Sequence, residues 1–102
     1  RMIKGDRDIE VEIEFDASFA HTVSDTLWHR TQSFDWHDDG SATFRCTVSG
    51  LDEITWWVLS MGPHCRVIAP AELAERVRDL AARTAVVYAG AAASPPSDEA
   101  LD

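Results

Sequence analysis

A chain of 102 residues with 45% hydrophobic residues and four tryptophans has the composition of one globular domain, which excludes a chain that is disordered throughout. Its 18 acidic residues outnumber its 9 basic residues, and a formal charge of −9 repels a phosphate backbone, so this chain alone should not grip duplex DNA. No apolar run reaches the roughly 18 residues that a membrane span needs, and no apolar signal core follows the basic N-terminus, so we expect a cytoplasmic protein with no membrane partner.

The first predicted element is a strand from Ile9 to Phe15. Apolar and acidic residues alternate along it with a period of two, which is typical of a strand with one face in the core. The acidic residues are Glu10, Glu12 and Glu14. Their face is therefore either solvated or matched by positive charge on neighbouring strands.

A first helix is predicted from Ala17 to Trp28. Asp16 is a good N-cap residue, and apolar residues follow at helical spacing. A β-hairpin comes next, with alternating runs at Ser33–His37 and Ala42–Val48. The turn between them closes with an Asp-Gly pair, which is the strongest short-range hairpin signal in the sequence.

A short amphipathic helix is predicted from Leu51 to Met61. Ser49 is a plausible N-cap, and Asp52 lies three residues later, in the position of a capping box. Gly62 can take the left-handed conformation that ends a helix, and Pro63 prevents the helix from continuing.

The last two predicted elements are a strand at His64–Ile68 and a helix that opens at Pro70, where a missing N–H costs nothing. Opposite charges spaced three or four residues apart on this helix predict a solvated face. We expect Gly90 to end the helix, and residues 90–102 to form a disordered acidic tail.

Strand, helix, two strands, helix and strand, followed by one more helix, predict an α+β fold: the ferredoxin-like βαββαβ antiparallel sheet with an additional C-terminal helix. The expected strand order is 4-1-3-2, with both helices of the repeat on one face. On the open face, the glutamates of the first strand would lie between Arg45 and Arg66. Cys46 and Cys65 would lie two strand spacings apart, about 10 Å, which is beyond the reach of a disulfide.

No pattern of residues predicts a metal, cofactor or catalytic site. The His and Cys residues lack C-x-x-C or H-x-x-x-H spacing, Ser60 lacks a glycine elbow, and no glycine-rich phosphate loop is present. We therefore expect a protein that is not an enzyme. A small enzyme that uses Glu12 or His64 for acid–base chemistry remains a further reading.

Two short motifs carry a resemblance to a known family. Residues 57–62 read W-x-L-S-x-G at the end of a helix, and residues 70–73 read P-x-E-L at the start of the next. Together they resemble the C-terminal extension (WCX) domain of bacterial WYL-domain transcriptional regulators. The resemblance implies that residues 8–89 are this domain and that residues 1–7 lead from a preceding one. The first residue, Arg1, is not an obvious initiator, so we expect a fragment of a longer protein, with a natural start at Met2 as the alternative.

The family architecture places a helix-turn-helix domain first, a WYL domain in the middle and this extension last. The resemblance therefore implies a role in dimerisation and, with the WYL domain, in sensing a nucleic-acid or small-molecule effector. The alternative is a free-standing ferredoxin-like module that binds a small molecule in an apolar cleft. Candidate ligand or interface residues are Arg30, Arg45, Arg66, His64 and Trp56.

Overall fold

The computed structural model describes the backbone of residues 8–93 and the side chains of residues 8–90. The predicted lead at residues 1–7 and residues 94–102 of the predicted tail lie outside these ranges. The elements, in order, are β1 (Ile9–Phe15), α1 (Ala17–Ser24), β2 (Ser33–Trp36), β3 (Ala42–Val48), α2 (Asp52–Ser60), the short 3-10 turn η2 (Gly62–His64), β4 (Cys65–Ala69) and α3 (Ala71–Ala93). Among the described residues, no helix is both long and apolar enough to cross a bilayer.

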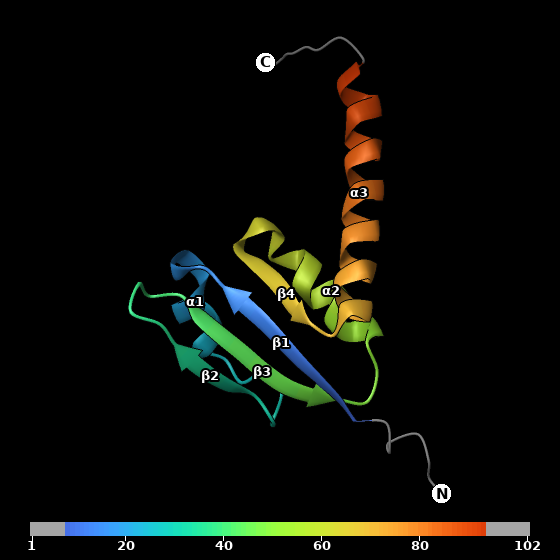
Figure 1. Cartoon of the computed structure of the whole chain (residues 1–102). Coiled ribbons are helices and arrows are strands. Elements are labelled where there is room, and N and C mark those ends of the chain that lie inside the picture. Colours follow the sequence, from blue (N-terminus) through green and yellow to red (C-terminus); the bar gives the residue numbers. More distant parts are fainter. Residues whose placement is uncertain (1–7, 94–102) are drawn as a thin grey trace, which may run out of the picture.

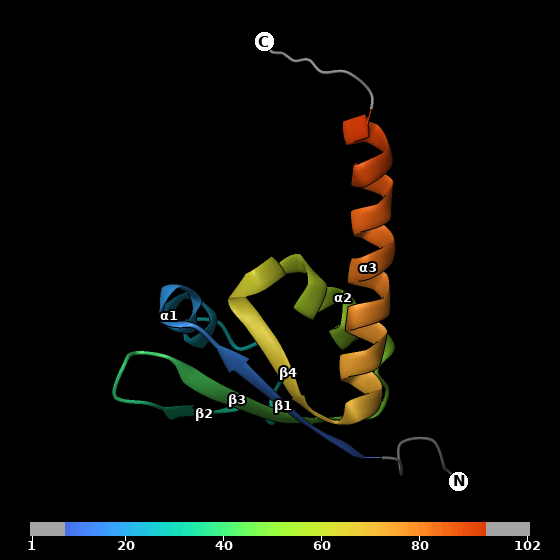
Figure 2. The same cartoon turned by 45° about the horizontal axis from the view of Figure 1, so that its top comes forward.

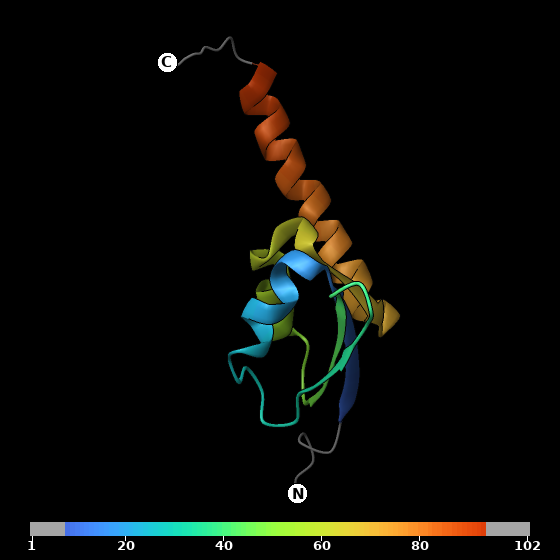
Figure 3. The same ribbon diagram turned by 90° about the vertical axis from the view of Figure 1, so that its left-hand side faces the viewer.

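The molecule is an α+β domain built on a four-stranded sheet in the order β2-β3-β1-β4, with every neighbouring pair antiparallel (Figure 1). Read from the β4 edge, this is the expected strand order. Figures 2 and 3 show α1 and α2 on the same face of the sheet, so that within residues 8–93 the other face, here called the open face, carries no helix.

The core lies between the sheet and these two helices. Alternate residues of β1 and β3 point into it, because successive side chains of a strand point to opposite faces. Phe15 and Phe44 are fully buried, with ring centroids 6.1 Å apart in an edge-to-face arrangement. The helices contribute the fully buried side chains of Ala20 from α1, Ile54 from α2 and Leu73 from the start of α3.

Helix α1 is shorter than predicted, because it ends at Ser24 and not at Trp28. Its N-cap is confirmed, since the Asp16 carboxylate accepts a hydrogen bond from the Phe19 amide at 3.0 Å. Trp28 leaves the helix to stack on Trp57 of α2, with ring centroids 4.4 Å apart. This contact between distant parts of the chain outweighs the helical spacing that favoured a longer helix.

The predicted capping box of α2 is wrong. The residue before the helix is Leu51, which is 5% exposed and makes no capping hydrogen bond through its side chain. Burial of Leu51 in the core sets the start of this helix. Its end is close to the prediction, because Gly62 has φ of 59°, the left-handed conformation that ends a helix and favours glycine.

Helix α3 continues through Gly90 to Ala93, so the prediction that Gly90 ends it is wrong. Glycine inside a helix costs only about 1 kcal/mol relative to alanine, and the residues around it are alanines. The first half of α3 packs beside α2 and β4, whereas its second half projects away from the body (Figures 1 and 2).

Candidate functional site

The open face of the sheet carries alternating charges. Strand register places Glu12 opposite Arg45 and Glu14 opposite Arg66, on either side of the acidic strand β1. The Arg45 guanidinium lies 3.4 Å from the Glu12 carboxylate, and the Arg66 guanidinium lies 3.1 Å from the Glu14 carboxylate. Of the two expectations for this face, solvated or matched by positive charge on neighbouring strands, the structure shows the second, as ion pairs across three strands.

Strand β2 adds a further acid to this face, since Asp35 lies 3.6 Å from the second Arg45 nitrogen. With Glu10 included, four carboxylates face two guanidinium groups, so the open face is acidic. The paired side chains are between 35% and 75% exposed, which limits each pair to about 1 kcal/mol or less. These pairs therefore order the charges on the face more than they stabilise the fold.

His64 has a different role from the arginines of the sheet. Its ring stacks on Phe19 of α1 at a centroid distance of 4.0 Å, and its Nδ1 lies 3.0 Å from the Asp16 carboxylate. The hydrogen bond from His64 is the main cause that lowers the pKa of the Asp16 carboxyl below its ordinary value. His64 therefore fastens the start of α1 to the start of β4.

The other two candidates lie elsewhere. Trp56 is 62% exposed and lines a hollow of about 300 Å³ between α2 and α3, in the helical layer. Arg30 is exposed in the turn that follows α1, and it forms no ion pair within residues 8–90. The five candidate residues thus do not form one site: Arg45 and Arg66 share the open sheet face, and Arg66 also lines a hollow of about 350 Å³ with His64.

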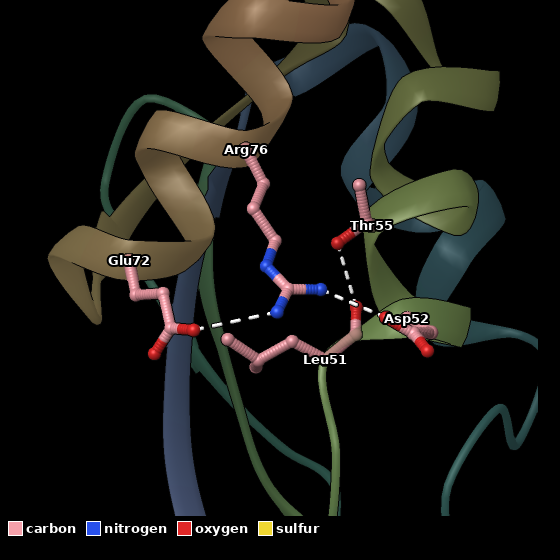
Figure 4. Close-up of polar contacts among 5 residues, drawn as sticks. All are labelled: Leu51, Asp52, Thr55, Glu72 and Arg76. Carbon is pink, nitrogen blue, oxygen red and sulfur yellow. Dashed lines mark hydrogen bonds and ion pairs between the residues drawn. The ribbon is translucent and has the colours of Figure 1, made fainter.

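Arg76 joins α3 to α2 in a way that the spacing of residues did not reveal (Figure 4). Its guanidinium contacts Glu72 on its own helix at 3.4 Å and Asp52 in the first turn of α2 at 2.8 Å. In the same first turn of α2, the Thr55 hydroxyl donates a hydrogen bond to the Leu51 carbonyl at 2.6 Å. Helical spacing predicts the contact with Glu72, but the contact with Asp52 depends on how the two helices pack.

A second feature that the sequence did not reveal is a groove of about 560 Å³ between the end of α2, strand β4 and the first half of α3. We call it the α3 groove. Its lining is mainly apolar and includes Val58, Val67, Val77 and Ala81, together with Arg66 and Arg78.

Both cysteines are free thiols, as predicted. Burial raises the pKa of Cys46 and of Cys65 to about 11. Since the thiolate is the reactive form, both are weak nucleophiles at neutral pH. Among the described residues, no three His, Cys, Asp or Glu side chains gather closely enough to hold a metal ion.

Comparison with known proteins identifies the family. The model of the WCX domain matches residues 7–85. Protein PafC from Mycobacterium tuberculosis, in strains CDC 1551 / Oshkosh and ATCC 25618 / H37Rv, is 45% identical over 58 residues. That match covers 57% of this chain and only 18% of the relative. Because the family model covers most of the chain, and agrees with the motifs at residues 57–62 and 70–73, this chain belongs to the WCX-domain family.

Proposed function

We propose that this domain is the non-catalytic C-terminal interaction domain of a WYL-type transcriptional regulator. In this role it helps to join two copies of the regulator and takes part, with the WYL domain, in sensing a nucleic-acid or small-molecule effector. The observation that carries the proposal is the WCX match over residues 7–85. We further propose that its architecture is the ferredoxin-like one with an added helix, which the strand order and the two helices on one face support.

The open sheet face is the surface that we assign to docking on another domain of the regulator. A polar sheet face in contact with water is ordinary in antiparallel sheets, so exposure by itself does not favour docking. What favours it is the ordered row of charges, which is suited to fixing the orientation and choice of a partner. The excess of carboxylates on this face calls for a partner surface with basic groups.

The excess of carboxylates on the open face also limits the kind of effector that this face can bind. A phosphate-rich ligand would meet repulsion from Glu10, Glu12 and Glu14 if it bound to this face alone. We therefore assign the anion-binding groups of any nucleic-acid effector to the WYL domain. The extension then responds to the effector through its docking surface.

Charge reversal in the intact regulator tests this proposal. The double substitution Arg45→Glu and Arg66→Glu should reduce the effector-dependent change in transcription by about tenfold or more, because like charges that meet at an interface are strongly unfavourable. The response is measured with a reporter gene, and the mass of the regulator by light scattering.

Arg83→Glu is the matched control, because Arg83 is also exposed and also lies 3.1 Å from one carboxylate, that of Asp79 on the same helix. The control should behave as the unaltered protein. If the double variant keeps both the mass and the response of the unaltered regulator, the sheet face has no docking role.

A further inference from the structure

The second half of α3 exposes large apolar side chains. Val86, Val87 and Tyr88 are 69%, 68% and 69% exposed, on a segment that projects from the body of the domain (Figure 2). In contrast, the first half is anchored by Leu73, which is fully buried. Large apolar side chains that remain in contact with water are candidate contacts for a partner, and the face of the helix on which each one lies decides which partner it can meet.

Tyr88 lies on the same face of α3 as the residues of the α3 groove. A helix turns about 100° per residue, so positions 74, 77, 81 and 88 fall within one narrow stripe. Ala74, Val77 and Ala81 line the groove. Tyr88 is seven residues beyond Ala81, and Ala74 is seven residues before it, which is about 10.5 Å in each direction. Along this stripe, the α3 groove therefore lies on the N-terminal side of Ala81, and the aromatic side chain of Tyr88 lies on its C-terminal side.

We propose that the partner of this surface is a second copy of the chain. The two α3 helices cross antiparallel at Ala81, and Tyr88 of each copy enters the α3 groove of the other. This inference rests on the proposed function and deepens its dimerisation part, because it names the surface at which two copies meet.

The lengths of the two halves of α3 match this arrangement. Residues 71–81, which pack on the body, span about 16 Å, and residues 82–93, which project from it, span about 18 Å. An antiparallel crossing at Ala81 therefore lays the projecting half of each helix along the body of the other copy. Ala81 and Ala85 are small residues in the stripe, so the two helices can approach closely.

The polar groups of the groove also suit this occupant. Arg78 lines the groove and forms no ion pair with any residue in the range 8–90. Helical side chains lean toward the N-terminus, so Arg78 leans toward Ala74, the level at which Tyr88 of the second copy arrives. A guanidinium over an aromatic ring is a favourable cation–π contact.

The first test compares Tyr88→Ala with Val86→Ala in the whole chain. The two residues have the same exposed fraction, but they lie about 160° apart around the helix, so only Tyr88 faces the groove. Sedimentation over a range of concentrations should show a dimer of the unaltered chain. Tyr88→Ala should raise the dissociation constant of this dimer at least tenfold, and Val86→Ala should change it less than threefold.

The second test places a cysteine at the crossing. Helix axes about 8–10 Å apart, with Cα atoms about 2.3 Å from each axis, bring the two Ala81 Cα atoms to about 5 Å, within reach of a disulfide. Ala81→Cys should therefore give a covalent dimer on mild oxidation, and Ala82→Cys, about 100° away, should not. Both variants carry Cys65→Ser, because Cys65 lines the same groove and would compete for the new thiol.

The outcomes separate this inference from the proposed function. A dimer that is equally sensitive to Tyr88→Ala and Val86→Ala, or cysteines that cross-link equally well at positions 81 and 82, would overturn the α3 crossing but leave dimerisation standing on another surface. A chain that stays monomeric at every concentration would overturn the inference together with the dimerisation part of the proposed function. The groove would then be left to another domain or to a small molecule.

Discussion

Asp16 connects three parts of the domain through one side chain and one amide. Its carboxylate caps α1 through the Phe19 amide and accepts a hydrogen bond from His64, while its own amide donates to the His64 carbonyl at 2.9 Å. Because the hydrogen bond from His64 lowers the pKa of the Asp16 carboxyl, we expect the contribution of this contact to stability to depend on pH.

Asp16→Asn should lower the free energy of unfolding at pH 7 while keeping the cap, since asparagine is an equally good N-cap residue. A carboxyl group with a lower pKa in the folded state stabilises the fold above its unfolded pKa and loses this effect as the pH falls through the folded value. The difference in free energy of unfolding between the unaltered chain and Asp16→Asn should therefore be fully present above about pH 4. It should disappear as the pH falls below this value. Urea unfolding between pH 7 and pH 2.5 measures this difference.

The control for this prediction is the same comparison in a His64→Phe background. Phenylalanine keeps an aromatic ring over Phe19 but cannot donate to the carboxylate. Most of the pH-dependent difference should disappear there. A difference that is equally large without His64 would mean that the low pKa of Asp16 has another cause.

Helix α2 presents its two tryptophans to opposite environments. Trp57 contacts three aromatic rings of the core region, at centroid distances of 4.4 Å to Trp28, 5.2 Å to Phe44 and 5.9 Å to Phe15. Trp56, one residue earlier, is 62% exposed. The helix thus packs on the sheet through one tryptophan and offers the other to the solvent or a partner.

Trp57→Ala should lower the free energy of unfolding by about 3–5 kcal/mol, as is usual when a large aromatic side chain is removed from a core. Trp56→Ala should change it by less than about 0.5 kcal/mol, because that side chain lies on the surface. Urea denaturation of both variants checks this. Similar losses for the two would show that α2 does not pack as described.

The elements differ in how well the sequence predicts them. Strands β1 and β3 were predicted with their correct bounds because alternation over seven residues also fixes which face is buried, and the hairpin followed from its turn. Helix ends were predicted less well. The end of α1 depends on Trp28 reaching Trp57, and the start of α2 depends on the burial of Leu51, which are both contacts between elements.

The candidate surfaces also differ in how well the sequence predicts them. The pairing of Arg45 and Arg66 with glutamates of β1 was predictable because strand order and alternation place these residues opposite one another. The α3 groove and the contact between Arg76 and Asp52 were not, since they depend on the distance and angle between two helices. Spacing within one helix contains no information about either quantity.

At the scale of the whole molecule, the domain is elongated. Its radius of gyration is 16.8 Å, against about 13 Å for a compact chain of 100 residues, because α3 projects from the body. Each copy also carries a formal charge of −9, so two copies repel each other when they meet.

Salt should therefore strengthen the dimer that α3 forms. The proposed contact is mainly apolar, so screening the repulsion between the two copies should lower the dissociation constant several-fold between about 20 mM and 300 mM salt. An interface built from ion pairs would weaken over the same range. Sedimentation equilibrium at both salt concentrations distinguishes the two, and a dimer that dissociates at high salt would contradict an apolar α3 contact.

The two cysteines, Cys46 buried and Cys65 half-buried, allow the opening motions of the domain to be measured by chemical modification. With pKa values of about 11, only about one thiol in a thousand is ionised at pH 8, so a thiol-reactive reagent modifies the folded molecule slowly. Cys46 lies in the sheet, and Cys65 lies at the start of the edge strand β4. The modification rate of the buried Cys46 therefore reports how often the sheet centre opens, and the half-buried Cys65 serves as the internal comparison at the edge of the sheet.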